Sequence, residues 1–104
     1  MLMAVVVLMS YRRGRRFEYE VRDFFEDRGW LVIRAARSKP VDLVCIKDGR
    51  VMLVECKYAG GRLLKEERKA LEKIGKRYGV DVVVARRKKR GETELETLHH
   101  SKGL

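Results

Sequence analysis

Three charged residues lie inside the most apolar part of the chain, where a buried strand would normally carry none. The segment KPVDLVCIKDGRVMLVECKY, residues 39–58, contains Asp42, Glu55 and Lys57 within two valine-rich runs. Carboxylate oxygens are the ligands that Mg²⁺ prefers, and a nearby lysine can stabilise charge that develops on a phosphate. Two acids and a lysine at strand ends therefore indicate metal-assisted hydrolysis of phosphodiesters.

The dipeptide Asp48-Gly49 between the two runs predicts a two-residue hairpin loop, because both central positions of such a loop favour positive φ. The register that follows sets Asp42 opposite Glu55, with Cβ atoms about 5 Å apart on one face. Lys57 follows on the same face two residues later. The carboxylates would repel unless Lys57 or a divalent cation neutralised them. We expect the cation, with Mn²⁺ able to replace Mg²⁺, and the simple ion pair is the alternative.

The same register separates the two cysteines. Cys45 and Cys56 lie four positions apart along the ladder, roughly 13 Å at the rise of a strand, which is too far for a disulfide. We expect both to be small core residues in a protein of the reducing cytoplasm. His99 and His100 have no partner pattern nearby, so the sequence does not predict a zinc site.

The charge balance indicates a polyanionic partner. The chain has 104 residues, 25 Lys and Arg against 15 Asp and Glu, and a net charge of +10, which favours nucleic acid. Two basic runs stand out, RRGRR (residues 12–16) and RRKKR (residues 86–90). The first flanks Glu18 and is the better candidate for contact with phosphates. The second is either a further contact or a solvated surface.

Periodicity predicts a single small α/β domain over residues 10–104. An amphipathic helix runs from Phe17 to about Gly29, and a second covers residues 63–78 before Gly79. Strands are predicted at residues 30–36, on both sides of the hairpin loop, at 80–85 and at 93–98. The order α-β-β-β-α-β, with a peripheral last strand, indicates a central mixed β-sheet flanked by helices. The apolar opening, residues 1–9, is too short to span a bilayer, and it is expected to form an extra strand or an extension before the functional start.

The acids and the lysine also resemble a known signature. P-V-D followed by E-C-K is similar to the P-D…(D/E)-x-K pattern of the restriction-endonuclease-like nuclease superfamily. The wider segment, residues 11–57, resembles the N-terminal half of archaeal Holliday junction resolvases. It shares their basic lead, an early helical Glu, an Arg on the next strand, a Ser before the Asp, and Glu-x-Lys.

The resemblance assigns roles by position. It implies that Glu18, Asp42, Glu55 and the backbone carbonyl of Cys56 bind the metal, that Lys57 is catalytic, and that Ser38 lies near the scissile phosphate. The residues that it and the basic pattern assign to DNA binding are Arg12, Arg13, Arg15, Arg16, Arg34 and Lys39.

The expected function is a Mg²⁺-dependent, structure-selective DNA endonuclease that resolves four-way junctions without a small-molecule cofactor or a membrane. A two-fold junction must be cut on two strands, so we expect a homodimer, with part of residues 63–78 at or near its interface. The alternative for that helix is that it only covers the sheet. The alternative functions are another nuclease of the superfamily, of repair or restriction type, and a non-catalytic nucleic-acid-binding subunit.

Overall fold

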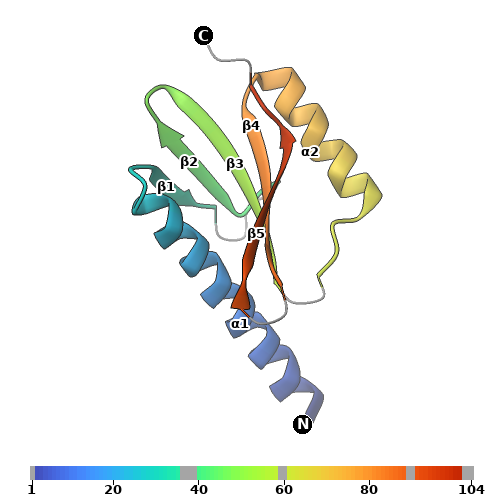
Figure 1. The fold of residues 1–104 in the computed structure, drawn as a ribbon. Coiled ribbons are helices and arrows are strands. Elements are labelled where there is room, and N and C mark those ends of the chain that lie inside the picture. The colour runs from blue at the N-terminus through green and yellow to red at the C-terminus, as the bar shows by residue number, and fades with distance from the viewer. Residues whose placement is uncertain (1, 36–39, 59–60, 89–90, 102–104) are drawn as a thin grey trace.

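The computed structural model describes residues 2–35, 40–58, 61–88 and 91–101, with side chains described from residue 13 onward. The elements follow in the predicted order, with α1 and α2 on opposite sides of one sheet (Figure 1). They are α1 (Leu2–Glu26), β1 (Leu31–Arg34), β2 (Leu43–Lys47), β3 (Arg50–Lys57), α2 (Lys65–Tyr78), β4 (Asp81–Arg87) and β5 (Thr93–His99).

The sheet is mixed, as predicted. Its strand order is β1-β2-β3-β4-β5, and all neighbours are antiparallel except β3 and β4. A parallel pair needs a crossover connection, and α2 is that connection. β4 lies between two neighbours, and residues 81–85 are all buried, which confirms the prediction of a strand covered on both faces.

The hairpin between β2 and β3 has the predicted register. Asp48 and Gly49 have φ of 49° and 77°, so both adopt the left-handed conformation that the turn requires. Pairing runs from Lys47 opposite Arg50 to Leu43 opposite Val54. Every side chain of β3 is thereby assigned to one face of the sheet.

The main core lies between α1 and the sheet. Phe17, Val21 and Phe25 recur at helical spacing and are all buried against the strands. Cys45 belongs to this core, Cys56 packs against it, and both thiols are free, which confirms their prediction as core residues. The remaining members are Leu43, Met52, Val54, Val83 and Ala85.

A smaller core lies under α2, where Leu71 packs with Val41 and Val82. The helix ends as predicted, because Gly79 adopts φ 64° and its N–H bonds the carbonyl of Gly75. α2 contacts β4 and β5, so it covers only part of its face of the sheet.

The apolar opening of the chain is helical. α1 begins at Leu2 and continues without a break through the basic segment to Glu26 (Figure 1). The expectation of an extra N-terminal strand is therefore wrong. Within the described residues, no helix combines the length and apolar content that crossing a membrane requires.

Gly75 provides a test of the packing between α2 and β5. A Cβ at this position would lie 2.6 Å from Cβ of His99, whose Nδ1 is bound to the Val80 carbonyl at 2.9 Å. We expect Gly75→Ala to lower the free energy of unfolding by about 1–3 kcal/mol, the usual cost of overpacking.

The control is Gly14→Ala in α1, where a Cβ meets no described atom within 4 Å. Alanine is the better helix former, so this variant should gain up to about 1 kcal/mol. Urea unfolding of both variants gives the comparison. A Gly75→Ala protein as stable as the wild type would show that His99 moves aside at little cost.

Candidate active site

Asp42 is held in place by backbone hydrogen bonds on both sides. Its N–H donates to the Val54 carbonyl at 3.1 Å, and its carbonyl accepts from the Ala35 N–H at 2.8 Å. Oδ2 of its carboxylate accepts the backbone N–H of Cys56 at 2.8 Å. β2 starts one residue later, so Asp42 lies just outside the ladder and faces the end of β3.

The three predicted acids share one region, around Cys56. Burial raises the pKa of the Cys56 thiol, and the charges of Asp42, Glu18 and Glu55 raise it further. Glu55 itself is only 4% exposed, although it carries a carboxylate. Burying a carboxylate is costly unless a partner compensates its charge, so this arrangement indicates a functional site.

Glu18 points toward the site, as predicted from its place beside the apolar stripe of the helix. Its side chain is 17% exposed, against 47% for Glu20. Burial raises the pKa of Glu18, as does the charge of Asp42, while Arg34 and Arg15 offset part of the shift. Glu18 and Asp42 are therefore close enough to repel each other.

Arg34 lies beside Glu18 and forms an ion pair with it. Its Nε lies 3.6 Å from Oε1 of Glu18, within the range of an ion pair but beyond hydrogen-bond length. Both atoms are buried, and neither has a hydrogen-bond partner among the described residues. An oxygen in this state is suited to accept a ligand.

Lys57 binds an unpredicted partner. Its Nζ donates to Oε2 of Glu67, on α2, at 3.1 Å. The sequence suggested the Asp42 and Glu55 pair as the alternative partner for this ammonium. The structure instead connects the lysine to the first turn of α2.

The acids suit a hard divalent cation by their chemistry. Carboxylate oxygens and a backbone carbonyl are the donor types that Mg²⁺ and Mn²⁺ prefer, and the Oε1 atom of Glu18 has no hydrogen-bond donor among the described residues. The described residues do not contain three or more acidic, His or Cys side chains already closed around a metal position. Glu18 instead contacts Arg34, and Asp42 accepts the Cys56 N–H.

The basic residues of the first run differ in exposure. Arg13 and Arg16 are exposed, and Arg15 is half-buried and close enough to lower the pKa of Glu18. Arg34 lies over the ring of Tyr19, at 5.3 Å from its centroid. Ser38, Lys39 and the side chain of Arg12 lie outside the described residues.

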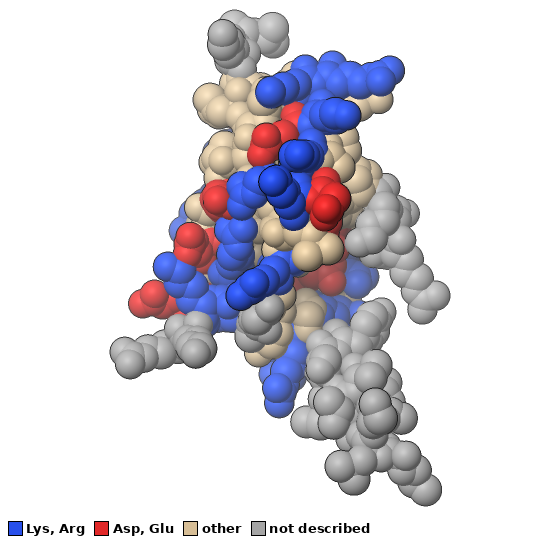
Figure 2. Space-filling view, turned by 90° about the vertical axis from the view of Figure 1, so that its right-hand side faces the viewer, with Lys and Arg blue, Asp and Glu red and all other residues tan. Residues whose placement is uncertain are grey.

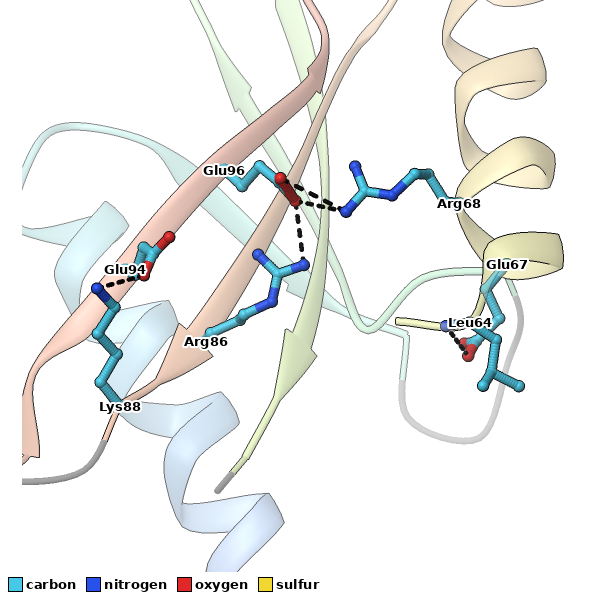
Figure 3. Close-up of polar contacts among 7 residues, drawn as sticks. All are labelled: Leu64, Glu67, Arg68, Arg86, Lys88, Glu94 and Glu96. Atoms are coloured by element: carbon cyan, nitrogen blue, oxygen red, sulfur yellow. Dashed lines mark hydrogen bonds and ion pairs between the residues drawn. The ribbon is translucent and has the colours of Figure 1, made fainter. Parts of the chain in front are cut away.

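The described part of the second basic run, residues 86–88, forms ion pairs within the fold, and residues 89 and 90 lie outside the described residues. Arg86 binds Glu96 at 3.0 Å and Lys88 binds Glu94 at 2.7 Å (Figure 3). Arg87 pairs with Glu20 of α1 and lies over the ring of Phe17. Residues 86–88 are therefore paired within the fold, an arrangement that differs from both the DNA contact and the solvated surface considered from the sequence.

Sequence reasoning missed Glu67 and Arg68 as residues of this region. Glu67 lies on the stripe of α2 that faces the sheet, among Leu63, Leu71 and Ile74. The signal in the sequence that could have indicated Glu67 is a charged residue on an otherwise apolar stripe. Its partner could not be read from the sequence, because Lys57 precedes it by ten positions on another element.

A mixed sheet flanked by two helices, with acids and a lysine at the end of β3, has the arrangement of restriction-endonuclease-like nucleases. The family described as archaeal Holliday junction resolvase (hjc) matches residues 9–102. The chain therefore belongs to this family.

Two relatives are informative. The crossover junction endodeoxyribonuclease Hjc of Methanocaldococcus jannaschii is 38% identical over 65 residues, which span 62% of this chain and 49% of that protein. The matched part is thus about half the length of this curated relative. The solved structure of Archaeoglobus fulgidus Hjc, a Holliday junction resolvase from an archaeal hyperthermophile, superposes with a TM-score of 0.69 at 22% identity. The superposed region covers 82% of this chain and 72% of the Archaeoglobus chain, and the match confirms the fold.

The raised pKa of Glu18 has a consequence for stability. Its ordinary value is 4.5, and a higher value in the native state means that the folded protein loses stability as the pH rises through this range. We therefore expect Glu18→Gln to melt at a higher temperature than the wild type near pH 7 in EDTA. The gain should shrink toward zero as the pH falls well below 4.5, where the wild-type carboxyl becomes protonated in both states.

Melting curves across this pH range check the expectation, and Glu66→Gln, at an exposed position of α2, is the matched control. A Glu18→Gln protein that melts below the wild type at neutral pH would show that the attraction of Arg34 outweighs burial.

Proposed function

We propose that this protein is a Mg²⁺-dependent, structure-selective DNA endonuclease that resolves four-way Holliday junctions by paired phosphodiester hydrolysis. The observation that carries the proposal is the convergence of Glu18, Asp42 and Glu55 around Cys56, with Lys57 at the end of the same strand. Family membership and the crossover junction endodeoxyribonuclease of Methanocaldococcus support the choice of substrate. The free cysteines are consistent with action in the reducing cytoplasm.

The site residues would perform two tasks, metal binding and the stabilisation of the reacting groups, and the basic residues would perform a third, DNA binding. Glu18, Asp42, Glu55 and the carbonyl of Cys56 would hold Mg²⁺, which when bound polarises the phosphate and activates water. Lys57 orients the attacking water or stabilises the charge that develops on the phosphate.

Positive charge holds the DNA. The described arginines of the first basic run lie on α1 beside Glu18, so the phosphates that they bind are delivered to the acids. Figure 2 shows further Lys and Arg side chains, with acids among them, on the side of the molecule that carries α2. The exposed basic residues of α2 are Lys65, Lys69, Lys73, Lys76 and Arg77.

Cleavage assays on labelled four-way junction, flap and duplex DNA test the proposal. Asp42→Asn and Glu55→Gln should each abolish Mg²⁺-dependent cleavage and leave junction binding intact or tighter. The reason is that these acids hold the metal and repel phosphate, so removing their charge harms the reaction but not the attraction.

Glu66→Gln removes the same charge at an exposed position and should cleave like the wild type. Normal cleavage by Asp42→Asn or Glu55→Gln would exclude the assigned site. A wild type that binds junctions but cleaves no DNA with Mg²⁺ or Mn²⁺ would favour the non-catalytic alternative.

We further propose that a second copy of the chain covers the part of the sheet that α2 leaves open. Ile33, Val44 and Leu53 form a row across β1, β2 and β3 on the face opposite α1. Ile33 is 48% exposed, and Val44 and Leu53 line an apolar hollow bordered by Ile74 and Tyr78. A two-fold dimer through this face would supply two sites for paired cuts.

We propose that the helix of residues 63–78 combines the two roles considered from the sequence, covering the sheet and contributing to the interface. Leu71 is buried on the sheet, as the covering role requires, whereas Tyr78 is 65% exposed beside the hollow. Only the C-terminal part of α2 is therefore proposed at the interface.

Light scattering at micromolar concentration tests the dimer. Wild type should have twice the chain mass of 12.2 kDa, and Ile33→Glu and Tyr78→Glu should be monomers, because each places a charge in an apolar interface. Leu95→Glu is the control, since Leu95 is 42% exposed on β5, at the other edge of the sheet. A monomeric wild type, free and on junction DNA, would exclude the paired-cut mechanism.

A further inference from the structure

The first turn of α2 carries a carboxylate that is fixed at both oxygens. Oε1 of Glu67 accepts the backbone N–H of Leu64 at 3.1 Å, immediately before the helix (Figure 3). Oε2 accepts the ammonium of Lys57 at 3.1 Å. The bond to Leu64 satisfies a backbone donor that helix ends leave open, and it also sets the direction of the other oxygen.

The turn itself is tied to the sheet by the next residue. Arg68 binds Glu96 of β5 at 2.9 Å, and Arg86 of β4 binds the same carboxylate at 3.0 Å (Figure 3). The hydrogen bond from Arg68 and the neighbouring Arg86 lower the pKa of Glu96 despite its partial burial, so it stays ionised. Arg86 is the residue paired with Lys57 in the register of β3 and β4. The base of Glu67 is therefore anchored next to the strand that carries the lysine.

A lysine needs such support to act at one point in space. Its flexible stem holds about 2 kcal/mol of rotamer entropy, and catalysis falls steeply when a group is displaced from its productive position. Lys57 is 20% exposed and its Nζ is bound by Oε2 of Glu67, so this carboxylate limits the motion of the ammonium.

We propose that Glu67 is a positioning residue for Lys57, which holds the ammonium at the reacting phosphate through the anchored first turn of α2. This inference rests on the role given to Lys57 in the proposed function. It adds a fifth side chain, from a separate element, to the set that determines the rate. Glu67 contacts neither the metal nor the DNA in this proposal.

Glu67→Gln separates positioning from helix capping. Glutamine serves as well as glutamate in a capping box, but an amide that caps with its oxygen presents its NH₂ group to Lys57 and offers it no acceptor. We expect a cooperative urea transition weakened by no more than the lost ion pair, an unchanged junction Kd in EDTA and an unchanged KM. The value of kcat in Mg²⁺ should fall by about 10- to 100-fold, the effect of misplacing a reacting group. Glu66→Gln, in the same turn and exposed, should match the wild type in every measurement.

A Glu67→Gln enzyme with wild-type kcat, beside an inactive Lys57→Ala, would overturn the inference and leave Glu67 as a cap only. Full activity in Lys57→Ala would instead overturn the role of Lys57, and this inference with it.

A measurement of stability tests the contact between Lys57 and Glu67 independently of whether the protein cleaves DNA. The unfolding free energies of Lys57→Met, Glu67→Gln and the double variant should be non-additive, as expected for residues in direct contact. Additive values would overturn the contact on which positioning depends, whether or not the protein cleaves DNA.

Discussion

The tight turn at Asp48 and Gly49 is the constraint on which the site depends. Two consecutive positive φ angles allow only one register between β2 and β3, and a slip of one residue would exchange the two faces of the strand. That register buries Val54 and Cys45 in the core under α1. It also brings the segment before β2 to the end of β3, where the backbone of Cys56 meets Asp42.

Charge compensation makes this concentration of acids tolerable. Three of the ionised groups near the end of β3 meet an opposite charge or a backbone donor contributed by a different element. Asp42 takes an N–H from β3, Glu18 of α1 lies near Arg34 of β1, and Lys57 binds Glu67 of α2. The removal of any one element would leave a desolvated charge without compensation, which costs far more than the lost contact itself. The site and the fold are therefore stabilised by the same interactions.

The two helices cover different parts of the sheet, and α2 leaves part of its own face open. α1 packs on β1, β2 and β3 from one side, while α2 packs on β4 and β5 from the other. The part of the sheet that α2 leaves open is apolar across three strands, and it lies on the same face as Glu67 and Lys57. A short helix placed close to one edge by the contact of Gly75 with His99 thus leaves this part of the sheet open, where we propose a second copy. It also presents its first turn to β3, through the contact of Glu67 with Lys57.

The sequence by itself determined the order of elements, the hairpin register, the core cysteines and the acids that share a region, because turn chemistry and hydrophobic period act locally. It also indicated the family, through P-V-D followed by E-C-K and the wider resemblance of residues 11–57. The tertiary structure alone decided which partners the charges take: Glu67 for Lys57, Arg34 for Glu18 and Glu20 for Arg87. It likewise decided that the opening segment is helical and that α2 covers only one side of its face. Such pairings join elements that are distant in the chain, and their geometry depends on how the helices pack. No local pattern of residue types encodes that packing.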